Sequence, residues 1–246
     1  MTPETLLLAA LFFAAALLYA SVGHAGASAY LAAMALVGVA PETMRPTALV
    51  LNLFVATIVV TRFSRAGHLP WRSLVPLIVG SIPMAFVGGS IDLPGEVYRP
   101  LVGIVLLAGA WRLATAAPSN DGEAPPGIPL VPGIAVGAGI GLLAGLTGTG
   151  GGIFLTPLLV LAAWTGTRDA AGLSGAFILA NSVAGLAGLL TAGFSLPPAI
   201  GAWVVAVAAG GLIGSWLGAE RFSILNLRRV LAFVLVLAAA KIVLLP

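Results

Sequence analysis

Two short stretches hold the small and polar residues from which an anion site without acidic side chains can be built. They read ASVGHAGASAYL at residues 20–31 and AGLTGTGGGIFL at residues 144–155. Glycine weakens a helix, so we expect a helix to end in each stretch and to restart near Ala29 and near Ile153. The first turn of each restarted helix presents free backbone N–H groups and the positive end of its dipole. Such groups bind oxyanions.

Glycines and hydroxyl groups at the two breaks, which we place at residues 20–28 and 147–152, complete the predicted set of donors. No Asp or Glu, which a cation site would require, lies in either stretch, so we expect an anionic substrate. Each helix end supplies about half a positive charge, and two ends therefore match a monoanion. The candidate substrate-binding residues here are Ser21, Gly26 and Ser28 in the first break and Thr147, Gly148, Thr149, Gly150, Gly151 and Gly152 in the second.

His24 and Arg45 are candidate sources of the further positive charge that a dianion would need. His24 is the only ionisable side chain between Glu4 and Glu42. A histidine within a membrane is a candidate proton carrier or anion donor; the alternative is a neutral imidazole bonded to neighbouring backbone. Arg45 precedes Pro46 at a predicted helix start. It either attracts substrate or lies at the membrane interface, paired with Glu42.

Asn52 and Asn181 lie at similar points of two apolar runs. They either line the substrate cavity or bond across helices, and their paired occurrence favours the cavity. Ser174 and Ser182 share the predicted helix of Asn181. We give them less weight, because a serine hydroxyl can bond to the backbone of its own helix.

The remaining residues argue against several other chemistries. GLTGTGGG resembles a phosphate-binding loop, but that loop requires a lysine after its last glycine, and the chain has no lysine before Lys241. The chain contains no cysteine, which excludes disulfides and thiolate metal sites. The apolar runs contain no acid–base pair or cluster of metal ligands, so we expect no enzyme, no catalytic residues, no metal site and no cofactor.

The composition is that of a membrane protein. Hydrophobic residues make up 60% of the 246 residues and charged residues only 8%, against about a quarter in soluble domains. About 20 apolar residues cross a bilayer as a helix. We therefore expect an all-α, multi-pass protein of the bacterial inner membrane, whose partners are the lipid bilayer and a small anion rather than nucleic acid. Runs without charge cover residues 5–41, 46–61, 73–91, 124–167 and 170–219.

The chain repeats one order of segments twice. A long apolar run (3–40 and 130–164) is followed each time by three shorter helices. The two halves, 1–115 and 130–246, are joined by a linker rich in proline, glycine and acidic residues at 116–129. Each long run exceeds the length of one crossing, so we expect it to fold back at its break. This order predicts 8–10 transmembrane segments, with the shorter helices near 46–62, 73–90, 98–113, 169–190, 197–218 and 227–244.

Basic residues indicate that the two halves have opposite orientations in the membrane. The loop after the first helix that follows the long run is basic in the first half, whereas its counterpart at 191–197 carries no charge. Because basic loops lie inside, we expect inverted repeats with both termini outside. Arg168 and Asp169 are expected to form an exposed pair. The predicted inside residues are Arg62, Arg65, Arg72, Arg112, Arg168, Arg221, Arg228 and Arg229, and the outside ones are Arg45, Arg99 and Lys241.

Glycines at a spacing of four residues indicate helix packing instead of chemistry. Gly150 and Gly151 lie off that spacing, and each weakens a helix by about 1 kcal/mol, which favours a functional break over a packing face. The glycines with the packing spacing are Gly133, Gly137, Gly141 and Gly145, and Gly210, Gly214 and Gly218.

The run GLTGTGGGIFLTPLLV at residues 145–160, its weaker first-half copy, the central linker and the length together resemble the TauE/SafE family of sulfite exporters. The signature is Gly148 and the glycines at 150–152, followed five residues on by Pro157. The first-half copy departs from it, with Gly26 alone and Ala33 in place of the proline. The resemblance implies a secondary transporter of sulfite, sulfonates or related sulfur-containing anions.

We therefore expect a secondary transporter that holds a small sulfur-containing anion, such as sulfite, sulfoacetate or a taurine-related anion, at the N-termini of the two restarted helices. Alternating access around that site is expected, with a coupled proton as one option. A passive anion channel and a carrier of another organic anion are the alternatives. The residues leave open whether the chain forms a homodimer.

Overall fold

The structure, a computed structural model, describes residues 2–115, 127–218, 235–236, 239–241 and 243. Most of the predicted linker, much of the predicted helix near 227–244, and the predicted inside residues after position 218 lie outside this part of the chain. The described residues form α-helices and no strand. This confirms the prediction of an all-α protein.

The order of helices follows the predicted order of segments. The first half contains two helices from the long run and then three longer ones: α1 (Pro3–Ala20), α2 (Ala27–Val37), α3 (Pro41–Arg65), α4 (Trp71–Ser90) and α5 (Gly95–Thr115). The second half contains α6 (Leu130–Thr147), α7 (Gly152–Leu161), α8 (Thr167–Ala192) and α9 (Ile200–Gly218).

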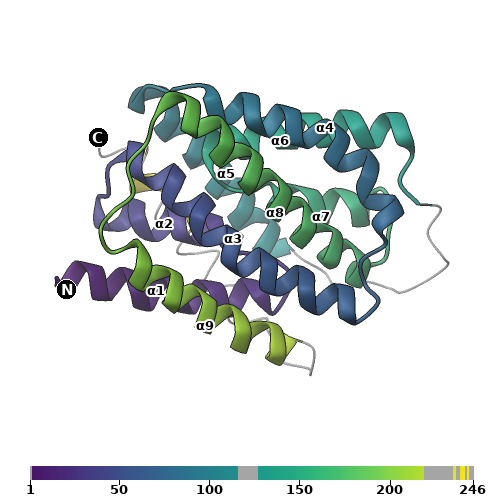
Figure 1. Cartoon of the computed structure of the whole chain (residues 1–246), viewed down its shortest axis with the longest axis horizontal. Helices are drawn as coiled ribbons and strands as arrows, with labels where there is room; N and C mark the ends of the chain where they lie inside the picture. Colours follow the sequence, from purple (N-terminus) through teal and green to yellow (C-terminus); the bar gives the residue numbers. More distant parts are fainter. Residues whose placement is uncertain (1, 116–126, 219–234, 237–238, 242, 244–246) are drawn as a thin grey trace.

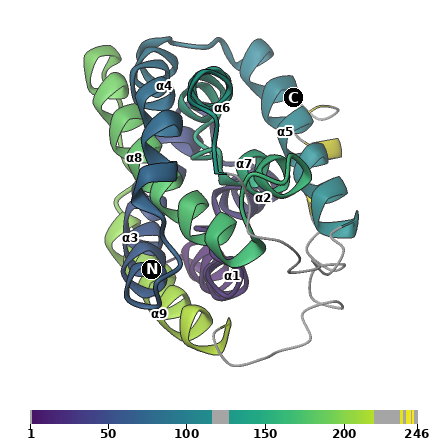
Figure 2. The same ribbon diagram turned by 90° about the vertical axis from the view of Figure 1, so that its right-hand side faces the viewer.

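Six of these helices are long and apolar enough to cross a membrane, namely α1, α3, α4, α6, α8 and α9. The shorter α2 and α7 are too short to span a bilayer of about 30 Å. They lie in the middle of the bundle when it is viewed along its helices (Figure 2). The total of 8–10 crossing segments remains a prediction.

Glycines in the left-handed conformation interrupt the helices at both predicted breaks. Between α1 and α2, Gly23 and Gly26 have φ values of 82° and 100°. Between α6 and α7, Gly148, Gly150 and Gly151 have φ values of 81°, 72° and 84°. Glycine adopts this conformation without the steric cost that a Cβ atom imposes. The local sequence thus accounts for where each long run breaks.

The predicted glycine faces pack helices of one half against helices of the other. Gly137, Gly141 and Gly145 of α6 face the backbone of α4, and a Cβ on any of them would lie within 3.0 Å of an α4 carbonyl oxygen. Gly210 and Gly214 of α9 face the backbone of α1 in the same way. These two helix pairs form opposite long edges of the molecule (Figure 1). Small residues permit such close approach of helices in a membrane.

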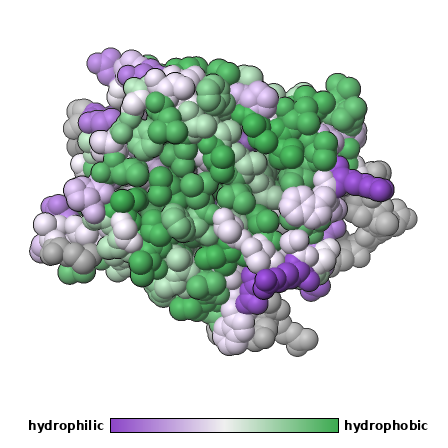
Figure 3. All heavy atoms as spheres, viewed as in Figure 1, coloured by the Kyte–Doolittle hydropathy of each residue, from purple (hydrophilic) through white to green (hydrophobic). Residues whose placement is uncertain are grey.

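The surface has the distribution of polarity expected of a membrane protein. A broad hydrophobic area occupies the middle of the face in view, and hydrophilic residues gather toward its ends (Figure 3). Trp71, Trp111 and Trp216 are among the exposed large side chains, whereas Trp203 is buried and its indole N–H donates to the carbonyl oxygen of Thr5 at 3.1 Å.

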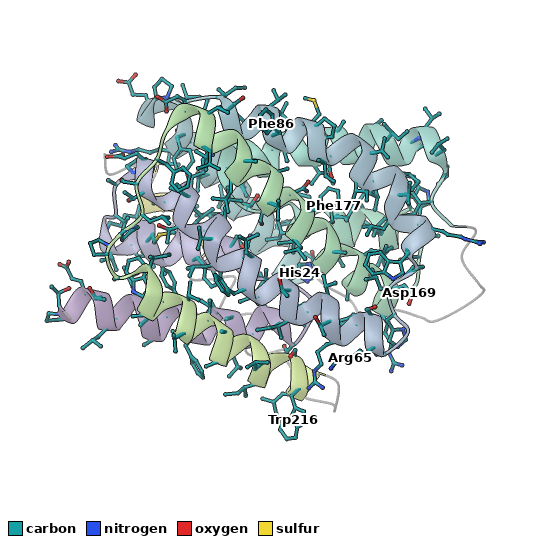
Figure 4. The ribbon with its side chains drawn as sticks, viewed as in Figure 1. His24, Arg65, Phe86, Asp169, Phe177 and Trp216 are labelled. Atoms are coloured by element: carbon teal, nitrogen blue, oxygen red, sulfur yellow. The ribbon has the colours of Figure 1, made fainter. Side chains whose placement is uncertain are left out.

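The loop after α3 and the first turns of α8, to which the charge pattern assigns the same side of the membrane, lie at the same end of the bundle. His68 Nδ1 lies 3.2 Å from Asp169 Oδ1, and Arg65 and Asp169 both lie toward the right-hand part of the molecule in Figure 4. Asp169 thus contacts His68, because α8 packs its first turn against the loop after α3, and its pairing with Arg168 remains a prediction. The orientation of the bundle in the membrane, and the inversion of the repeats, remain predictions.

Candidate functional site

The second break exposes a row of backbone donors inside the protein. In the first turn of α7, the N–H groups of Phe154 and Leu155 donate to the carbonyl oxygen of Gly151 at 3.1 and 3.2 Å. The N–H groups of residues 150–153 have no acceptor among the described residues. A helix start leaves such groups unpaired unless a cap, water or ligand meets them, and α7 has no side-chain cap.

Three polar side chains from two other helices surround Gly150. A Cβ atom on Gly150 would lie 2.8 Å from Asn52 Nδ2 of α3 and 3.4 Å from Ser182 Oγ of α8. Asn181, also of α8, donates from Nδ2 to the carbonyl oxygen of Gly150 at 3.4 Å. The absence of a side chain on Gly150 therefore leaves the polar groups of α3 and α8 close to the second break.

These side chains are buried without the hydrogen bonds that burial normally requires. Asn52, Asn181 and Ser182 each have a relative exposure of 0%. Both amide atoms of Asn52, Oδ1 of Asn181 and Oγ of Ser182 have no partner. Each such atom costs about 1–3 kcal/mol of stability, and a cluster of them needs an explanation. A bound ligand that supplies the missing partners is one.

His24 connects the first break to the second. Its Nε2 lies 3.2 Å from the carbonyl oxygen of Gly152 and 3.0 Å from Oγ1 of Thr156, while Nδ1 lies 3.1 Å from the carbonyl oxygen of Val22. Thr156 is in turn 2.6 Å from Ser174 Oγ. Carbonyl oxygens only accept, and a neutral imidazole has one N–H. Only protonated His24 can donate to both carbonyl groups.

Local bonds engage most other polar groups of the first break. Ser21 Oγ donates to the carbonyl oxygen of Leu18 at 2.7 Å, and Ser28 Oγ lies 2.8 Å from Tyr19 Oη. The Tyr30 hydroxyl donates to the carbonyl oxygen of Ala25 and covers Gly26, whose Cβ would lie 2.9 Å from it. Ser21 and Ser28, predicted to face the substrate, are thus occupied within their own half.

Thr147 and Thr149 are also bonded locally, at the end of α6. Thr147 Oγ1 donates to the carbonyl oxygen of Leu143 at 2.6 Å and lies 2.9 Å from Thr149 Oγ1. Both side chains are buried. They shape the start of the second break, between α6 and the glycines that follow.

Arg45 is buried, not interfacial, and it binds backbone instead of Glu42. With an exposure of 5%, it donates from Nη1 to the carbonyl oxygen of Ile91 at 3.0 Å and from Nη2 to that of Gly88. These carbonyl groups lie at the C-terminal end of α4, where a positive charge is favourable. Nε of Arg45 is buried without a partner.

A cavity of about 310 Å³ lies beside Arg45, at the end of the bundle predicted to face outside. Glu42, Asp92 and Tyr98 contribute to its wall, together with Arg45. The Tyr98 hydroxyl donates to the carbonyl oxygen of Thr147 at 3.2 Å, and Gly148 packs against the backbone of Arg45. Arg45 and Tyr98 thus lie between this cavity and the second break.

Several site residues were missed or underweighted by the sequence pattern. Ser182 was recognisable from its position next to Asn181, and Ser174 from its place on the same helix. Thr156 lies within the run at 145–160 but was given no role, and Tyr98 follows no motif; the packing of distant segments brings them to His24 and Thr147.

Long apolar helices around two central short helices, with buried polar groups at a break between them, define a multi-pass helical membrane protein. The family described as sulfite exporter TauE/SafE matches residues 7–242, and the chain therefore belongs to this family of membrane transporters. A protein of Sinorhizobium fredii named "Probable membrane transporter protein y4hK" is 38% identical over 245 residues, covering 98% of this chain and 99% of that protein. No solved structure matches the chain.

Proposed function

We propose that the protein is a secondary transporter of small sulfur-containing monoanions, such as hydrogen sulfite and sulfonates. The anion is held by the helix N-termini at the breaks, chiefly by the second break with Asn52, Asn181 and Ser182. The observation that carries this proposal is the set of buried, unpartnered polar atoms around Gly150. A broken helix leaves backbone N–H and C=O groups without hydrogen bonds, and within a membrane such a break is tolerated where it lines a substrate site.

The charge of the site supports an anion in preference to a cation. The free N–H groups of residues 150–153 lie at the positive end of α7, and the groups placed around Gly150 are amides and a hydroxyl, with no carboxylate. The α7 end supplies about half a positive charge, and the α2 end adds to it at longer range, so that the total is about one at most. This balances a monoanion, whereas a dianion would leave one negative charge unmatched.

The proposal of alternating access is supported by features at the two ends of the bundle. At the end predicted to face outside, a cavity of about 310 Å³ leads toward Arg45. At the opposite end, His68 binds Asp169, and Gly172 packs directly on the His68 carbonyl group. We propose that, during transport, the end with the cavity becomes packed and the packed end opens, while the anion stays at the second break.

Contacts made by the two breaks support the proposed inverted arrangement of the two halves. The tip of the first break, Gly23, packs on Ala171 in the first turns of α8, and the tip of the second, Gly148, packs on Arg45 in the first turns of α3. Each half thus contacts the other through the corresponding pair of segments. A rocking motion of one half against the other would change both contacts.

A proton is the coupling ion that the site accommodates best. His24 has a carbonyl oxygen within hydrogen-bond distance of each ring nitrogen, and the Thr156 hydroxyl also lies beside Nε2, so the ring has partners both with and without the second proton. Its contact with Gly152 joins that proton to the first turn of α7. Import and export then depend on the direction of the proton and substrate gradients.

Transport by the purified full-length chain in proteoliposomes tests the proposal. We expect uptake of labelled sulfite or of a sulfonate, faster when unlabelled substrate is inside, because a carrier returns more quickly when loaded. The matched variants are Asn52→Ala, which changes the site, and Ser215→Ala, which changes a buried serine bonded to its own helix. Flux that saturates poorly and shows no acceleration by internal substrate would identify a passive channel instead. If the folded protein is inserted in the vesicles and no anion flux is measured, the proposal is overturned.

A further inference from the structure

We infer that the transported anion carries a hydrogen-bond donor in addition to its charged oxygens, and that Asn181 selects for that donor. The inference rests on the proposed function, because it assumes that the second break binds the anion. It adds the chemical class of the substrate, which neither the family nor the helix dipoles determine.

The orientation of the Asn181 amide follows from its one partner. The group opposite it is the carbonyl oxygen of Gly150, 3.4 Å from Nδ2. A carbonyl oxygen only accepts, so the amide nitrogen must face it. The other amide atom, Oδ1, is thereby left as the free one. It is buried in a side chain of 0% exposure and has no partner.

A hydrogen-bond acceptor without a partner, placed beside an anion site, makes the site selective for ligands that carry a hydrogen-bond donor. The oxygens of a sulfonate or sulfite group carry negative charge and are repelled by an amide oxygen, so they cannot satisfy Asn181 Oδ1. An O–H or N–H group on the same ligand can. A site built to bond such a group rejects an analogue that lacks it, because the buried polar atom is then left unpaired.

The other unpartnered groups at the second break can bond the parts of the ligand that Asn181 does not bond. The Ser182 hydroxyl, Asn52 Nδ2 and the N–H groups of residues 150–153 are donors without partners, and they suit the charged oxygens of the ligand. Asn52 Oδ1 is a second free acceptor. Donors for the charged oxygens and acceptors for a proton-bearing group therefore meet at Gly150.

This arrangement fits two kinds of anion. One is a sulfonate with a hydroxyl or amino group on a nearby carbon. The other is hydrogen sulfite in its form with a proton on oxygen, which can donate that proton to an acceptor. Sulfate and other fully deprotonated dianions provide no donor and carry excess charge.

The test compares ethanesulfonate with 2-hydroxyethanesulfonate, which have the same charge and differ by one hydroxyl group. Dissociation constants are measured on the purified full-length chain by thermal stabilisation and by calorimetry. We expect the hydroxy compound to bind at least about tenfold more tightly to the wild-type chain. In Asn181→Leu the ratio should fall to about one, and in Ser215→Ala it should stay at the wild-type value.

Each other outcome is decisive. Equal affinity of the wild-type chain for the two sulfonates would overturn the inference while leaving the proposed anion site standing. An undiminished preference in folded Asn181→Leu would overturn the role of Asn181. Binding of neither sulfonate, nor of sulfite, would overturn the proposed function and the inference with it. The comparison on the wild-type chain remains decisive even where Asn181→Leu does not fold.

Discussion

The two helix breaks share a backbone design but differ in the polar side chains around it. Both use left-handed glycines, and both leave N–H groups without partners in the described part of the chain, at residues 25–28 and 150–153. At the first break, Tyr19 binds Ser28, and Tyr30 binds Ala25. At the second, amide and hydroxyl groups are buried and unpaired.

Two tyrosines account for much of this difference. Aligning residues 20–31 with 144–155 places Phe154 at the position of Tyr30, and the same offset places Leu143 at the position of Tyr19. The second break therefore lacks the two hydroxyl groups that bond within the first. One helix break is filled by its own side chains, and its relative is left with groups for a ligand. Repetition of the backbone does not imply repetition of the site.

The largest expected effect comes from filling the second break. In Gly150→Leu/Gly151→Leu, side chains are forced onto positive φ values and into contact with Asn52 and Phe177. We expect anion uptake in proteoliposomes to fall to background. Gly139→Leu is the control, since nothing lies within 4 Å of the Cβ position there. Wild-type uptake by the double variant, with normal membrane insertion, would rule out a site at this break.

Removal of an unpaired amide should weaken binding without weakening the fold. Asn52→Ala deletes both free atoms, so we expect anion affinity to fall by about 10–100-fold, since a hydrogen bond to a charged group is worth about 1.5–3 kcal/mol. The melting temperature without ligand should stay constant or rise, because buried unsatisfied groups are removed. Calorimetry and thermal unfolding measure the two effects. A large drop in stability with unchanged affinity would instead identify Asn52 as a structural link between helices.

Replacement of His24, which reaches from the first break to the second, should leave anion exchange intact and abolish its coupling to protons. His24→Gln keeps a donor that can reach the Gly152 carbonyl group but cannot titrate. We expect anion exchange at equal pH to persist and accumulation driven by a pH gradient to disappear. The measurement is uptake with and without an imposed gradient. Accumulation that survives the substitution would exclude His24 as the proton carrier.

The smallest effect is expected at the first break itself. Tyr30→Phe removes the bond to Ala25 and makes this position match Phe154. We expect a loss of about 1 kcal/mol of stability, a decrease of roughly 2–4 °C in melting temperature for a chain of this size, and anion affinity within about twofold of wild type. A tenfold loss of affinity at unchanged melting temperature would mean that both breaks bind the anion directly.

Local properties of the sequence determined the class of the protein and the positions of its breaks. Apolar runs specify membrane helices wherever they occur, and the glycines at 23, 26, 148, 150 and 151 adopt backbone angles that other residues avoid. The glycine spacing on α6 and α9 likewise predicted which helix faces pack. The repeat of segments remains a prediction, and the described helices follow the order that it predicts.

Only the tertiary structure decided which break has free polar groups and which residues meet there. Asn52 and Asn181 meet at Gly150, His24 reaches Gly152, Arg45 turns to the carbonyl groups of α4, and Asp169 pairs with His68. Each of these contacts joins segments far apart in the chain, and their geometry depends on how whole helices pack. A residue type shows which hydrogen bonds a side chain can make. Packing determines which of those bonds are already made, and therefore which remain for a ligand.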